Sequence, residues 1–160
     1  MAGIDILDYL IYKLNPGKIV KGDYEGFCVF RALKNETTGQ GFNRPLITYY
    51  HHGAGGNSKR SKGMLDNQMS GFTAPDADLI VFGHNHWKYF DPSNTRLKLD
   101  RLYNIIESDQ YVLRLGSYKK AKRYGWGTEK GFMPSKRGGW FVEMCVFSDE
   151  LKIKRIYEAN

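Results

Sequence analysis

The spacing of apolar residues changes along the chain from a helical period to strand-like runs. Between residues 4 and 14, apolar side chains recur every three or four positions, which is typical of an amphipathic helix, and Asn15-Pro16-Gly17 follows as a stop signal. A short apolar run at 27–33 predicts a buried strand. The first part of the chain is therefore expected to combine a helix with a strand.

The middle of the chain holds two strand-like runs that both end at histidines. Residues 46–50 and 79–82 are rich in β-branched and aromatic side chains, and residues 58–70 between them fit a basic, amphipathic helix. Three more strands are expected at 111–115, 140–147 and 151–157. This pattern predicts an α/β fold in a single domain covering residues 1–160, with a mixed or antiparallel sheet and helices near 4–14 and 58–70.

All four histidines fall in two clusters, each directly after one of these strands. His51 and His52 precede the glycine-rich stretch 53–56, and His84 and His86 are separated by one residue. Imidazole binds manganese, iron, nickel and zinc well, and strand ends in α/β folds are where ligands collect. The pattern therefore favours a metal site, with ordinary turn histidines on the surface as the alternative.

The sequence around the second cluster resembles a known metal-binding motif. The stretch 76–86, a hydrophobic strand followed by Gly83-His84-Asn85-His86, resembles the last motif of the calcineurin-like metallophosphoesterases. The stretch 47–53 is similar to the preceding motif of that family, a strand that ends in a metal-binding histidine. The resemblance covers roughly residues 45–147. It implies half of that family's β-sandwich, flanked by helices, and the hydrolysis of phosphomonoesters or phosphodiesters by metal-bound hydroxide.

The resemblance also implies a role for each histidine. His84 would coordinate one metal together with an upstream histidine, while His86 would coordinate the other metal, lie near the bound phosphate and act as the catalytic residue of this half. We prefer His52 as the upstream ligand because it directly precedes the glycine turn, whereas His51 would pack or support it. The cofactors implied are two divalent transition metal ions, from among manganese, iron, nickel and zinc.

The aspartate side of the family's site has no counterpart in this sequence. Three motifs of the family are missing: Asp-x-His, Gly-Asp-x-x-Asp, and Gly-Asn-His followed by Glu or Asp. Gly22-Asp23 matches the start of the second motif, but Gly26 occupies the position of its second aspartate. Asp23 is therefore not expected to be a ligand. Without a bridging carboxylate, we expect the chain to bind at most one metal and to be an inactive C-terminal fragment, its other half being a separate polypeptide or lost.

The charge of the chain adds phosphate-bearing partners to this picture. The 24 Lys and Arg residues against 17 Asp and Glu give a net charge of +7, which favours a phosphate-ester substrate or nucleic acid. The basic runs 59–62 and 119–123, with Tyr118, Tyr124 and Trp126 close by, suggest an alternative function as a noncatalytic nucleic-acid-binding or interaction module. A solvated charged surface would explain the same runs.

Cysteine usage and hydropathy bear on the compartment. Cys28 and Cys145 lie inside apolar runs, so we expect two buried thiols in a reducing compartment. No apolar run is long enough to cross a membrane, and we expect a cytoplasmic protein without a membrane partner.

The family resemblance carries a further expectation about association. In that family two sheets pack face to face, and the missing N-terminal half would supply most of one sheet. The chain would then keep an uncovered apolar face, which predicts self-association or binding to a complementary N-terminal fragment.

Overall fold

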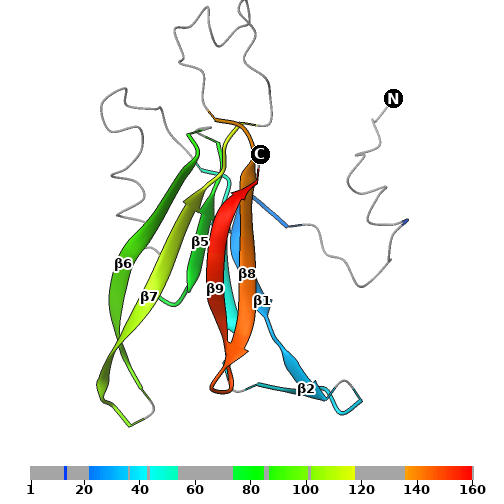
Figure 1. Ribbon diagram of the computed structural model, residues 1–160, viewed down its shortest axis with the longest axis vertical. Helices are drawn as coiled ribbons and strands as arrows, with labels where there is room; N and C mark the ends of the chain where they lie inside the picture. Colours follow the sequence, from blue (N-terminus) through cyan, green and yellow to red (C-terminus); the bar gives the residue numbers. More distant parts are fainter. Residues whose placement is uncertain are drawn as a thin grey trace, which may run out of the picture.

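The computed structural model describes residues 13, 22–35, 37–42, 44–53, 74–84, 87–100, 102–117 and 136–159. These residues form strands in three sheets (Figure 1). The strands are β1 (Glu25–Phe30), β2 (Leu33–Asn35), β3 (Gln40–Gly41), β4 (Leu46–His51), β5 (Leu79–Phe82), β6 (Tyr89–Leu99), β7 (Ile105–Arg114), β8 (Gly139–Phe147) and β9 (Glu150–Ala159).

The main sheet is mixed and has the strand order β1-β4-β5-β7-β6. Its three central strands, β4, β5 and β7, run parallel, whereas β1 and β6 pair antiparallel at the two edges. Strands β4 and β5 and the last residues of β7, 110–114, hold most of the buried positions of the sheet, because strands in the middle of a parallel sheet are buried on both faces. Parallel pairing also brings the C-terminal ends of β4 and β5 to the same end of the sheet.

One face of the main sheet is covered by the β8–β9 hairpin, which lies in front of the sheet in Figure 1. Leu46, Leu79 and Leu113 form a buried cluster on this face. The partly buried side chains that pack on it come from both layers: Val81, Phe90, Tyr111, Trp140, Val142, Leu151, Ile153 and Ile156. The hairpin therefore supplies the second layer that this apolar face requires.

The opposite face of the sheet holds a second apolar cluster. It is built around Ile80 and Val112, which are fully buried, together with Tyr49, Ala74 and Ala77. Residues from β4, β5 and β7 thus contribute to both clusters in alternation, as the pleat of a strand requires.

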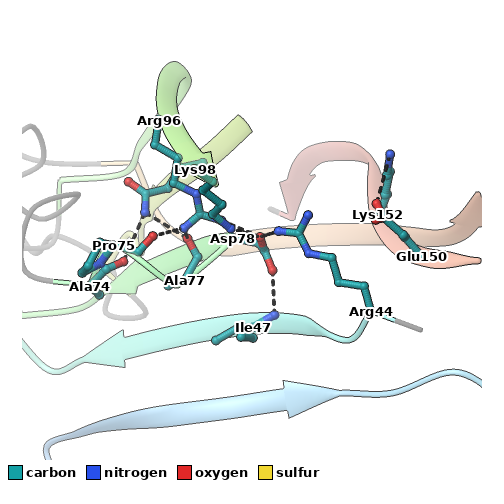
Figure 2. Close-up of polar contacts among 11 residues, drawn as sticks. Arg44, Ile47, Ala74, Pro75, Ala77, Asp78, Arg96, Lys98, Glu150 and Lys152 are labelled. Atoms are coloured by element: carbon teal, nitrogen blue, oxygen red, sulfur yellow. Dashed lines mark hydrogen bonds and ion pairs between the residues drawn. The ribbon is translucent and has the colours of Figure 1, made fainter. Parts of the chain in front are cut away.

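Asp78 anchors the start of β5 to its neighbours (Figure 2). Its carboxylate accepts hydrogen bonds from Ile47 N (2.9 Å), Arg44 (2.8 Å) and Arg96 (2.5 Å). Arg96 also donates to the carbonyl oxygens of Pro75 and Ala77, the two residues that lead toward β5. The contacts join β4, β5 and β6 at the end of the sheet that is remote from the histidines.

The predicted α/β fold with flanking helices is wrong, because the residues that the structure describes are almost entirely strand. The layer packed on the cluster of Leu46, Leu79 and Leu113 is a β-hairpin, whose alternating apolar residues suit a sheet surface. The helices predicted at 4–14 and 58–70 lie outside the described residues, apart from Lys13. In the described ranges, no helix is long and apolar enough to cross a membrane.

Two further expectations are corrected by the N-terminal edge of the sheet. The buried strand predicted at 27–33 is instead the exposed edge strand β1, which ends at Phe30. Cys28 lies on this strand and is exposed, and Cys145 is half-buried, so neither is the fully buried thiol expected; both are free cysteines.

Candidate metal centre

The ends of β4 and β5 bring the two histidine clusters together. The strands pair in parallel with His51 opposite Phe82, so the residues that follow them emerge side by side. His84 Nδ1 lies 3.2 Å from His52 Nε2, and the two ring centroids are 5.1 Å apart. Both side chains are exposed. Residues 32 positions apart in sequence thus bring two imidazole nitrogens within hydrogen-bonding distance of each other.

This approach depends on two glycines in the loops that carry the histidines. Gly53 has a φ of +95°, and a Cβ at this position would lie 3.0 Å from both Gly83 O and His84 Cβ. A Cβ at Gly83 would lie 3.1 Å from His52 O. His84 itself has a φ of +64°, in the left-handed region that only a few per cent of non-glycine residues adopt. The two loops therefore touch backbone to backbone, and a larger residue at Gly53 would separate them.

His51 is held in a different way from its neighbour. Its Nδ1 accepts a hydrogen bond from Gly53 N at 2.8 Å, and its Nε2 lies 3.7 Å from Glu25 Oε2. Because Nδ1 accepts this hydrogen bond, the proton of the neutral His51 ring lies on Nε2, which faces the Glu25 carboxylate. Both nitrogens of His51 therefore have protein partners, and the choice of His52 as the upstream ligand stays a prediction.

Two residues of β1 and the segment before it complete the surroundings of these histidines. Tyr24 O accepts a hydrogen bond from His52 N at 2.7 Å, and the Tyr24 ring meets the His52 ring edge-on with centroids 5.6 Å apart. Glu25 accepts a hydrogen bond from the Tyr49 hydroxyl at 2.8 Å. Burial, and then the bond and the negative charge of Glu25, raise the pKa of Tyr49 to about 12. Sequence reasoning passed over Tyr24 and Glu25, because a tyrosine and a glutamate on an edge strand carry no metal-binding pattern.

The 3.2 Å between His52 and His84 is a hydrogen-bonding distance, and it is also compatible with two ligands of one metal ion. Two nitrogens bound at 2.0–2.1 Å to a tetrahedral ion are about 3.4 Å apart, close to the 3.2 Å between His84 Nδ1 and His52 Nε2. The described residues contain no group of three or more His, Cys, Asp or Glu side chains placed to hold a metal. A complete coordination shell therefore needs ligands beyond these two.

Several residues singled out from the sequence lie outside the part of the chain that the structure describes. They include His86 and the basic and aromatic runs at 59–62 and 118–126. Asp23, which was not expected to be a ligand, accepts a hydrogen bond from Tyr24 N at 2.7 Å.

A buried lysine close to the histidine end of the sheet also escaped sequence reasoning. The Lys88 side chain is 0% exposed, and its ammonium donates to Ala159 O at 3.0 Å and lies 5.0 Å from the centre of the Trp140 ring. Glu158 Oε2 is 3.7 Å away. Lys88 therefore connects the end of β9 to the loop that follows the histidines. No sequence pattern near Lys88 predicts this contact.

No protein-family model, curated protein or solved structure matches this chain.

Proposed function

We propose that this chain supplies the histidine side of a metal-dependent phosphoesterase site. The observation that carries the proposal is the 3.2 Å separation of His52 Nε2 and His84 Nδ1, from two loops whose sequences resemble the histidine motifs of calcineurin-like metallophosphoesterases. In this proposal His52 and His84 hold one divalent transition metal ion, and His86 serves the second ion and the bound phosphate. The substrate is a phosphomonoester or a phosphodiester.

The residues of this chain prepare the site in three ways. The glycine loops set the distance between His52 and His84, and the Gly53 N–H fixes the His51 ring so that it does not compete for the metal. Tyr24 holds the His52 main chain at the C-terminal end of β4. Bound divalent ions generate hydroxide and stabilise the charge of a phosphoryl group during hydrolysis. The net charge of +7 attracts the anionic substrate.

The carboxylate side of the site comes from a second polypeptide in this proposal. Neutral imidazoles alone do not offset the charge of two divalent ions that lie close together. The purified chain should therefore show little or no turnover of a monoester or a diester with manganese or nickel. We also propose a cytoplasmic location, which is consistent with two free cysteines.

Metal titration tests the proposal without depending on activity. Isothermal titration of the purified chain with Mn²⁺, Ni²⁺ and Zn²⁺ should show at most one site, and His84→Ala and His52→Ala should each weaken binding about tenfold or more. His51→Ala is the matched control, because it removes a neighbouring imidazole whose nitrogens already have protein partners, and it should cost less affinity.

The same variants distinguish loss of a ligand from loss of the fold. Circular dichroism spectra and thermal midpoints of His84→Ala should match those of the unaltered chain, since His84 is exposed. Metal affinity that is unchanged in both His52→Ala and His84→Ala would refute the proposed site.

A further inference from the structure

Strand β1 forms an open and apolar edge of the main sheet. It is the terminal strand in the order β1-β4-β5-β7-β6, and within the described ranges no strand pairs with its outer side. Phe27, Val29 and Phe30 are 57%, 52% and 43% exposed, and no charged residue lies between Gly26 and Phe30. Natural edge strands usually carry charges or prolines that prevent pairing. Apart from Glu25 at its start, β1 lacks these features, and its apolar centre is suited to accept another strand.

The hydrogen bonds to β4 show which backbone groups of β1 face outward. His52 N donates to Tyr24 O, so Tyr24 and His52 form a hydrogen-bonded pair of this antiparallel ladder. Such pairs alternate along two antiparallel strands. The even-numbered residues of β1 therefore bond to β4, while Glu25, Phe27 and Val29 direct their N–H and C=O groups to the open side.

We propose that two copies of this chain pair through β1, antiparallel and about a twofold axis at Cys28. This register places Phe27 opposite Val29 of the second copy as a hydrogen-bonded pair, and Gly26 opposite Phe30. It also places Glu25 opposite Arg31 of the second copy, once on each side of the axis. The segment from Glu25 to Arg31 is thus complementary to itself, both in its apolar residues and in its charges.

The register with its twofold axis at Cys28 is favoured over registers that are shifted by one or two residues. A shift by one residue would pair residues whose side chains lie on opposite faces of the joined sheet, so the paired side chains could not contact each other. A shift that centred the axis on Phe27 would set Glu25 against Val29 of the second copy and lose the contact between Glu25 and Arg31. Only the proposed register matches a carboxylate with a guanidinium and a phenylalanine with a valine at the same time.

This pairing goes beyond the proposed function and does not depend on a bound metal. It joins two main sheets into one continuous sheet and closes after two copies, because the contact is made by the same strand on each side. The interface is small, so the dimer should dissociate on dilution.

Sedimentation velocity over a micromolar dilution series tests the interface. The unaltered chain should shift from monomer to dimer as its concentration rises, and Val29→Lys should weaken the dimer about tenfold or more by placing a charge on the pairing edge. Leu97→Lys is the matched control, since Leu97 is a 70% exposed apolar residue on the opposite edge strand, β6. It should leave the dimer unchanged.

Cysteine cross-linking tests the register. The axis makes Cys28 its own partner in a non-hydrogen-bonded pair, with Cα atoms about 4.5 Å apart, which is within the range of a disulfide. In the Cys145→Ser background, mild oxidation should give a covalent dimer, and adding Val29→Lys should slow its formation. Equal rates with and without Val29→Lys would mean chance collision and overturn the proposal.

Charge reversal gives a third, independent measurement. Arg31→Glu sets two carboxylates against each other on both sides of the axis and should weaken the dimer several-fold, whereas Arg31→Lys keeps the positive charge and should leave the dimer nearly unchanged. A monomer at every concentration, or a dimer that Leu97→Lys disrupts and Val29→Lys does not, would overturn the proposed interface.

Discussion

The Asp78 carboxylate lies 2.5 Å from the Arg96 guanidinium, and both side chains are largely buried, at 15% and 12% exposure. Arg44 and Lys98 approach the same carboxylate, at 2.8 Å and 3.5 Å. Burial, and then the nearby Arg96, lower the pKa of Lys98. Asp78 is therefore the carboxylate that balances several crowded cations where β4, β5 and β6 meet.

Replacing Asp78 by alanine should destabilise the protein strongly. The variant leaves Arg96 buried without its carboxylate and Ile47 N without an acceptor, and breaking a buried pair in this way costs about 3–5 kcal/mol. Urea denaturation measures the loss. Glu150→Ala is the control, because Glu150 pairs with a half-exposed Lys152 (Figure 2) and should cost about 1 kcal/mol or less. Equal losses in the two variants would contradict the assigned role of Asp78.

Gly53→Ala should reduce metal affinity as well as stability. A Cβ at Gly53 would press on His84 Cβ and Gly83 O, so the loops carrying His52 and His84 must move apart. Gly39→Ala is a matched control: Gly39 also has a positive φ, of +67°, but a Cβ there meets nothing within 4 Å. Both variants should lose about 1–2 kcal/mol through backbone strain, whereas titration calorimetry should detect weaker metal binding for Gly53→Ala alone.

Stability should fall at alkaline pH partly because of Tyr49. Its folded-state pKa of about 12 lies above the unfolded value of 10.0, so its contribution is complete below pH 10 and is lost as the pH rises toward 12. Tyr49→Phe should flatten the decline of the urea midpoint in this window. The decline should not vanish, because the pKa values of Tyr89 and Tyr111 are also raised by burial. Tyr103→Phe, at a residue that is 83% exposed, is the control for removing a tyrosine hydroxyl from the surface.

Lys88→Met should loosen the end of β9. The variant removes the donor to Ala159 O and the cation above the Trp140 ring while keeping a side chain of similar size. Leaving the partly buried Ala159 O without this donor costs about 1–3 kcal/mol. Amide hydrogen exchange should show faster exchange at residues 156–159. Lys136→Met is the control, since Lys136 also pairs with Glu158 but is 74% exposed, and its exchange should not change.

The central strands could be predicted from the sequence because their residues alone favour them. The runs 46–50 and 79–82 agree with β4 and β5 to within one residue, since β-branched and aromatic side chains fill both. Strand β6 was missed, because Pro92 and several polar residues interrupt its pattern. It tolerates them as an edge strand with an irregular register between Asp91 and Asn94.

The candidate site was predictable only in part. The meeting of His52 and His84 follows from two parallel strands that end together, which the strand pattern indicated. The fixing of His51 by Gly53 N and Glu25 could not be predicted from the sequence. Glu25 reaches His51 only because β1 pairs antiparallel with β4, and no local pattern encodes that pairing. The roles of these histidines in metal binding stay predictions.

The parallel pairing of β4, β5 and β7 has a consequence for the order of folding. Ile47 and Asp78, which hydrogen-bond where β4 meets β5, are 31 residues apart, so these contacts form only after a long loop has closed. Strands β8 and β9 are joined by a short turn, so they can pair early in folding. Long-range parallel contacts slow folding, and the hairpin should therefore be structured before the histidine loops meet. The contact between His52 and His84 should then form only in the last kinetic phase of refolding.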